Sequence, residues 1–88
     1  METILLSNGT LIENAHCLPS DERLYVYIQG MDIRTGFELF IEPENTRTIV
    51  SNRFGVDHVY EGYTDMYAIS MENNQCNVVL KKGAAANA

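Results

Sequence analysis

The chain has 88 residues, 45% of them hydrophobic, and it carries a formal net charge of −6. Domains usually have ~50 to 250 residues, so this length predicts a single domain, and the hydrophobic share is too high for an intrinsically disordered chain. The negative charge repels the phosphates of nucleic acids and of anionic membranes, which disfavours direct binding to either. We expect one compact domain over residues 1–82 and a flexible tail over residues 83–88.

The two cysteines, Cys17 and Cys76, lie far apart and form no C-x-x-C pair. A secreted disulfide scaffold of this size normally carries four or more cysteines. The chain shows no basic-then-apolar leader and no apolar run near the ~18 residues that span a bilayer. These features predict a reduced, cytoplasmic protein.

Two β-prone runs, residues 3–7 and 10–13, flank Asn8-Gly9 near the N-terminus. An Asn-Gly pair supplies the positive φ angles of a type I′ turn, whose twist suits the flanking strands. The pattern therefore predicts an N-terminal hairpin. Residues 14–22 contain Pro19, Ser20 and Asp21, which are typical of loops, and we expect a loop there.

Residues 23–29 alternate between two kinds of side chain. Leu24, Val26 and Ile28 fall on one face of the predicted strand, whereas Tyr25 and Tyr27 fall on the other. We expect the aliphatic face to meet the core, with the tyrosines half exposed or covered by another element.

Residues 32–41 have the spacing of a short helix. Asp32 is the predicted N-cap, and the apolar stripe expected to pack on the sheet consists of Ile33, Phe37, Phe40 and Ile41. Gly36 weakens a helix by ~1 kcal/mol relative to alanine, and we interpret it as a point where the helix approaches the sheet closely. Pro43 cannot continue the helix comfortably, so a turn is expected at 43–46.

The second half of the chain is dominated by β-prone runs. Residues 46–53 fit either a strand or a helix, and residues 54–57 are predicted as a connection. Residues 59–71 predict one long strand, in which Gly62 marks a bulge or a bend, and a turn at 72–75 leads to a strand over 76–81. The elements together predict an α+β fold: a small, twisted, mostly antiparallel sheet of five or six strands with one short helix packed on it.

Few residues offer catalytic or metal-binding chemistry. Zinc could in principle be held by His16, Cys17, His58 and Cys76, but structural zinc sites use tight paired spacings that are missing here. A Cys–His nucleophile needs a lowered thiol pKa, and nothing around either cysteine in the sequence suggests an electropositive pocket. The carboxylates at four-residue spacing would share one face in a helix; they are Asp57, Glu61 and Asp65. We therefore predict no enzyme, no metal site and no cofactor.

The tyrosines give the one positive indication of a site. They gather on two predicted strands, and tyrosine is enriched at interfaces because it joins a large apolar ring to a polar tip. The same rings also stabilise sheets by cross-strand packing, and the sequence leaves both interpretations open. The candidate binding residues are Tyr25, Tyr27, Tyr60, Glu61, Tyr63, Asp65, Tyr67 and Arg53.

Three motifs support a resemblance. They are Asn8-Gly9-Thr10, Glu42-Pro43-Glu44-Asn45-Thr46 and Val59-Tyr60-Glu61-Gly62-Tyr63-Thr64. With these motifs the chain resembles a group of small uncharacterised proteins encoded by phages and prophages of Gram-positive gut bacteria. The resemblance implies a phage or mobile-element setting, in the bacterial cytoplasm or on the virion, and it implies no catalytic or ligand residues.

Two classes of function follow. The first is a non-enzymatic binding or assembly protein that acts through a tyrosine-rich sheet surface, with a protein partner or as a homo-oligomer. The alternative is a phage counter-defence protein, which would occlude a basic nucleic-acid groove with the acidic stretch 32–72 or sequester a nucleotide signal. Sequestration would require arginines to meet the phosphates, and the candidates are Arg23, Arg34, Arg47 and Arg53.

Overall fold

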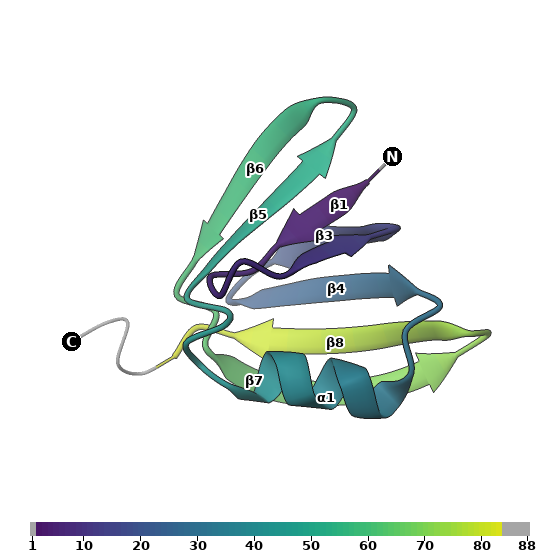
Figure 1. Cartoon of the computed structure of the whole chain (residues 1–88). Coiled ribbons are helices and arrows are strands. Elements are labelled where there is room, and N and C mark those ends of the chain that lie inside the picture. Colours follow the sequence, from purple (N-terminus) through teal and green to yellow (C-terminus); the bar gives the residue numbers. More distant parts are fainter. Residues whose placement is uncertain (1, 84–88) are drawn as a thin grey trace.

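The computed structural model describes residues 2–83, and these residues form eight strands and one helix (Figure 1). The strands are β1 (Thr3–Leu5), β2 (Leu11–Glu13), β3 (Ala15–Ser20), β4 (Arg23–Gln29), β5 (Thr48–Arg53), β6 (Val56–Glu61), β7 (Asp65–Glu72) and β8 (Gln75–Lys81), and the helix is α1 (Ile33–Ile41). The α+β class and the antiparallel pairing are confirmed. The expectation of one sheet with five or six strands is wrong.

The strands form two four-stranded sheets instead of one. Sheet A has the order β2-β1-β5-β6, sheet B has the order β3-β4-β8-β7, and every pairing is antiparallel. Sheet A packs on the β3 side of sheet B, and α1 lies over β7 and β8 (Figure 1). Sheet A and α1 therefore together cover the inner face of sheet B.

One hydrophobic core fills the space between these three layers. Sheet A contributes Ile4, Ile12 and Ile49, and α1 contributes Phe40. Sheet B contributes the largest share, namely Ala15, Cys17, Leu24, Val26, Ile28, Cys76, Val78 and Leu80. The predicted inward face of residues 23–29 is confirmed, and so are the half-buried positions of Tyr25 and Tyr27.

The N-terminal hairpin is confirmed, but its turn differs from the prediction. Leu5 pairs with Leu11, and Gly9 has a φ of 90° whereas Asn8 is outside the positive-φ region. The Gly9 amide donates to the Leu6 carbonyl at 3.0 Å, and the Leu6 amide donates to the Thr10 carbonyl at 2.9 Å. This is the three-residue hairpin loop with glycine in its last position, not the two-residue type I′ turn.

The loop predicted over residues 14–22 is wrong, because Ala15–Ser20 forms β3. Ala15 and Cys17 are buried at alternate positions, which holds the segment against the core. Pro19 is tolerated because β3 is an edge strand and pairs with β4 alone. Asn14, with a φ of 55°, forms the corner where the chain leaves sheet A for sheet B.

The single long strand predicted over residues 59–71 is also wrong. It is divided into β6, which belongs to sheet A, and β7, which belongs to sheet B. Gly62, with a φ of 84°, starts the corner between them, and its amide donates to the Arg47 carbonyl at 2.9 Å. β6 begins earlier than expected because Phe54 and Gly55 form a tight turn, both with positive φ, which makes β5 and β6 a hairpin.

The remaining expectations for the second half are settled by the strand pairs. Residues 48–53 are a strand, which resolves the open choice over 46–53. The turn before β8 is confirmed, with positive φ at Asn73 and Asn74. Gly83, which was assigned to the tail, is buried and donates its amide to the Gly62 carbonyl at 3.0 Å. Residues 84–88 of the predicted tail lie outside the described residues.

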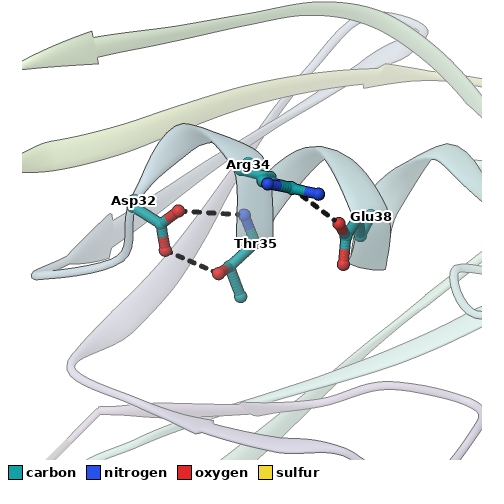
Figure 2. Close-up of polar contacts among 4 residues, drawn as sticks. All are labelled: Asp32, Arg34, Thr35 and Glu38. Carbon is teal, nitrogen blue, oxygen red and sulfur yellow. Dashed lines mark hydrogen bonds and ion pairs between the residues drawn. The ribbon is translucent and has the colours of Figure 1, made fainter.

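Helix α1 starts where the sequence predicts. The Asp32 carboxylate accepts hydrogen bonds from the Thr35 amide and the Thr35 hydroxyl (Figure 2), and the hydroxyl contact lowers the pKa of Asp32. The expected buried stripe is wrong, however, because only Gly36 and Phe40 are fully buried. Ile33, Phe37 and Ile41 stay 45%, 46% and 40% exposed. At nine residues α1 is too short to cross a membrane, and no other helix is present in the described part of the chain.

Gly36 is the contact point between α1 and sheet B, as expected. A Cβ atom at this position would lie 2.7 Å from the Cys76 Sγ and 3.3 Å from the Ile69 Cδ1. We predict that Gly36→Ala lowers the free energy of unfolding by about 1 kcal/mol, because overpacking of ~1–3 kcal/mol exceeds the ~1 kcal/mol gain in helix propensity. Urea unfolding measures this change.

The matched control for this prediction is the same substitution in a Cys76→Ala background. Removing the sulfur opens the space that the new methyl group needs, so Gly36→Ala should there be neutral or stabilising. An increase in stability from Gly36→Ala in the otherwise unchanged chain would show that the contact is looser than the structure describes.

Candidate binding surface

Three of the five tyrosines meet on the outer face of sheet B, the face opposite α1 and sheet A. We call this surface the tyrosine face, and it carries Tyr25 and Tyr27 of β4 and Tyr67 of β7. Three cross-strand rows surround the tyrosines, His16–Tyr27–Asn77–Ser70, Leu18–Tyr25–Val79–Ala68 and Ser20–Arg23–Lys81–Asp65, and a fourth row, Gln29–Gln75–Glu72, continues the same face. No described element covers it, as the view in Figure 1 also indicates, with α1 lying on the other face.

A β-bulge follows Tyr67 in β7. Tyr67 lies on the same side as Asp65, two residues before it, and the register shift between Met66 and Ala68 places Ala68 on this side too and turns Ile69 and Met71 to the inner face. The Arg23 guanidinium carbon lies 4.3 Å from the Tyr67 ring centroid, and the Lys81 ammonium lies 5.2 Å from it. Both distances are within the range of cation–π attraction, so Tyr67 is held in place although it is 54% exposed.

The charge of the tyrosine face differs from that of the whole chain. The face contains two cations, Arg23 and Lys81, and two carboxylates, Asp65 and Glu72, whereas the chain has a net charge of −6. Tyr27 packs on the His16 ring, with centroids 5.1 Å apart. The centre of the face therefore consists of aromatic, small apolar and amide side chains, and the carboxylates Asp65 and Glu72 lie at its two ends.

The other two tyrosines are not part of this face. Tyr60 and Tyr63 meet edge to face with ring centroids 6.4 Å apart, at the corner where the chain passes from sheet A to sheet B. Tyr63 is only 7% exposed, and the Lys82 ammonium lies 4.6 Å from its ring centroid. Burial, and then the nearby Cys17 and Tyr63, raise the pKa of Tyr60. This pair stabilises the corner and offers little surface to a partner.

Of the three remaining predicted site residues, two lie away from the tyrosine face. Arg53 pairs with Glu2 at 3.2 Å, between their Nε and Oε2 atoms. Glu61 ends β6 in sheet A, and its carbonyl accepts a hydrogen bond from Lys82 at 2.6 Å. Asp65 lies at the rim of the tyrosine face, opposite Lys81 in the register. The structure thus unites Tyr25, Tyr27, Tyr67 and Asp65 and separates them from the other candidates.

Sequence reasoning missed several members of the tyrosine face. Arg23 and Lys81 could have been found, because each keeps the alternation of its own strand and lies on the same side as Tyr25 and Val79. His16 and Leu18 could not be found, because Pro19, Ser20 and Asp21 predict a loop over residues 14–22. The opposite sides taken by Tyr67 and Ile69 depend on the bulge, for which the sequence of β7 has no glycine or proline as a signal.

Neither cysteine has the surroundings of a nucleophile. Both are buried and free. Burial raises the pKa of the Cys17 thiol to about 12, although the neighbouring Ser51 acts in the opposite direction. Burial, and secondarily Asp32, raise the pKa of Cys76. Within residues 2–83, no group of three or more His, Cys, Asp or Glu side chains is arranged to hold a metal ion.

A second open surface lies on the outer face of sheet A. Its central cross-strand row is entirely apolar, because Leu5 pairs with Leu11 and Val50, and Val50 pairs with Val59. The row lacks polar tips and cations, so it has none of the features that would orient a partner. We treat it as a comparison surface for the tyrosine face.

We predict that stability falls as the pH rises from about 9 towards 12, because Cys17 ionises near pH 9 when unfolded and near pH 12 when folded. The stabilisation is complete below pH 9 and is lost through this window, at about 1.4 kcal/mol for each pH unit. Urea unfolding near pH 7 and near pH 10 measures the loss.

Cys17→Ala is the control, because it removes the ionising group and should flatten this dependence. Cys76 and Tyr60, whose pKa values are also raised, leave a residual slope in the variant. Equal slopes in the two proteins would mean that the Cys17 thiol is accessible to water in the folded state.

Comparison of the chain with protein-family models, with curated proteins and with solved structures finds no match in any of the three. Function therefore has to be inferred from the surfaces that residues 2–83 present.

Proposed function

We propose that this protein is a non-enzymatic binding protein that recognises a partner protein through the tyrosine face of sheet B. One observation carries the proposal: Tyr25, Tyr27 and Tyr67 lie together on an uncovered sheet face, with Arg23 and Lys81 beside Tyr67. A phage or prophage setting, implied by the resemblance, is part of the proposal. The partner would then be a protein of the bacterial host or of the virion.

The chemistry of this face suits a protein partner. Tyrosine rings supply large contact areas with few rotatable bonds, and their hydroxyl groups still reach hydrogen-bond partners. Cores of protein interfaces are enriched in tyrosine and arginine and depleted of acidic residues, which matches the three rows of the face. A sheet surface is also rigid, so little entropy is lost when a partner binds.

Two other features support binding rather than catalysis. The Cys17 thiol, with a pKa of about 12, stays protonated at neutral pH and therefore supplies no thiolate nucleophile. Only two cations accompany the three tyrosines, on a chain with a net charge of −6. This charge disfavours binding to the phosphate backbone of a nucleic acid. Phosphate contacts usually dominate such complexes.

The alternative function, sequestration of a nucleotide signal, requires a binding pocket. The candidate is a hollow of about 290 Å³ at the end of the tyrosine face. Its lining residues are Ser20, Asp21, Glu22, Arg23, Tyr25 and Lys81. Two carboxylates balance the two cations, so the hollow has no excess positive charge to attract phosphates. The structure also gives little support to occlusion of a basic nucleic-acid groove. The acidic residues of stretch 32–72 are distributed over α1, the turn after it, β6 and β7 and do not form one surface.

We predict that a photoreactive phenylalanine analogue at position 27 crosslinks to a partner in the cells that make the protein. Tyr27 lies within the proposed surface, so the analogue would contact the bound partner directly. Phe54 provides the matched control, because it is 86% exposed in the β5–β6 turn, outside sheet B. The analogue at position 54 should give no crosslink to that partner.

The captured partner then allows a quantitative test. The triple variant Tyr25→Ala, Tyr27→Ala, Tyr67→Ala should weaken its binding about 100-fold or more, because each hot-spot tyrosine typically contributes at least ~1 kcal/mol. Leu11→Ala and Val59→Ala on the outer face of sheet A should leave binding unchanged. A folded triple variant that binds as tightly as the original protein would refute the proposal.

A further inference from the structure

We propose that a second copy of this chain docks against the free edge of β7 together with the exposed flank of α1, which gives a two-fold symmetric dimer. In this dimer β7 lies beside β7 of the other copy, and α1 lies beside the other α1. The inference is independent of the tyrosine face, because it uses the edge and the helix side of sheet B rather than its outer face.

The edge of β7 is suited to strand pairing. β7 is the last strand of sheet B and, at eight residues, the longest strand in the described part of the chain. Edge strands are usually protected by lysine, proline, short length or a bulge. The interior of β7, Met66–Met71, contains no charged residue and no proline, and its one bulge, between Met66 and Ala68, leaves residues 68–72 regular.

The exposed flank of α1 continues this edge as an apolar surface. Ile33, Phe37 and Ile41 follow one another at intervals of four residues, so they form one stripe along the helix. The stripe points away from sheet A, because Thr35 on the opposite flank lines a hollow with Ile12 of β2 and Ile28 of β4. Arg34 and Glu38 form an exposed i,i+4 ion pair on the same helix (Figure 2).

The strand adds apolar side chains on the same side. Ile69 and Met71 pair with Val78 and Cys76 in the register, which places them on the inner, helix-bearing face of sheet B. Ile69 lies near Gly36 of α1, and Met71 is 40% exposed. The inner face of β7 and the flank of α1 therefore both present apolar side chains on the helix-bearing side of sheet B.

A second copy of the chain is the partner that fits the β7 edge and the α1 flank at the same time. α1 lies along β7 and β8 (Figure 1), so one two-fold axis beside β7 brings strand to strand and helix to helix together. An antiparallel pairing centred on Ser70 would place Ile69 opposite Met71 and Glu72 opposite Ala68 of the other copy. No like charges then face each other across the paired strands.

The area indicates a dimer of moderate strength. Ile33, Phe37, Ile41 and Met71 are each 40–46% exposed, which leaves roughly 350 Å² if a side chain of this size presents about 200 Å² in full. Two copies would bury roughly twice that area, below the ~1,200 Å² of a standard interface. Strand pairing would add backbone hydrogen bonds to this small area, and we expect a dissociation constant in the micromolar range.

Sedimentation velocity and native mass spectrometry test the proposal on the full chain. At about 100 μM, where a complex with a micromolar Kd is formed, the mass should be twice the monomer mass of 9.9 kDa. Phe37→Glu should raise the dissociation constant about tenfold or more while leaving the urea midpoint nearly unchanged, since Phe37 is 46% exposed. Hydrogen exchange of the β7 amides should slow as the protein concentration rises.

Val59→Glu is the matched control, because it places the same charge on the apolar row of sheet A. It should leave the dimer intact. A monomer at about 100 μM would overturn the proposal and leave this surface to a different partner. A dimer that Val59→Glu dissociates and Phe37→Glu does not would also overturn it, and would assign self-association to the outer face of sheet A.

Discussion

The fold depends on how few elements are available to cover its sheets. Eight strands form two sheets, but the described residues provide only one helix to pack on them. Sheet A and α1 both pack on the inner face of sheet B, and the core between the three layers uses nearly all the fully buried side chains. A small domain buries a limited share of its surface. Both outer faces and the β7 edge consequently stay exposed, and another molecule can bind and cover each of them.

The close contact at Gly36 makes this arrangement possible. Because this residue has no side chain, α1 reaches Cys76 and Ile69 directly, and Phe40 enters the core from the same helix. The helix is thus anchored by a narrow stripe, and its apolar flank remains outside the core. The exposure of Ile33, Phe37 and Ile41 follows from how closely the helix packs, since a helix held at a larger distance would need those residues to fill the gap.

The sequence predicted local structure well where one strong pattern acted alone. The alternation in residues 23–29, the N-cap at Asp32 and the turn at Asn73 and Asn74 were all recovered, because each depends on neighbouring residues. The sheet changes at Asn14 and Gly62 were not, because a corner and a bulge have similar sequence signals. Strict alternation cannot say which of two sheets a strand joins.

The same limit explains the candidate site. The sequence correctly placed Tyr25 and Tyr27 on one surface, because they lie on the same face of one strand. Tyr67 lies on that surface too, because β8 connects its strand, β7, to β4 within sheet B. Tyr60 and Tyr63 looked equivalent in the sequence but belong to the corner between the sheets, where they pack on each other and beneath Lys82. Membership in one surface is a tertiary property, and it required the order of the strands to be known.

We infer that a partner covers the tyrosine face when the protein works. Hydroxyl-radical footprinting tests this most directly, by comparing tyrosine modification in the purified protein with that in the cells that make it. Tyr25, Tyr27 and Tyr67 should be modified in the purified protein and protected in cells, while the buried Tyr63 should be protected in both. Equal modification of the three tyrosines in both settings would contradict it.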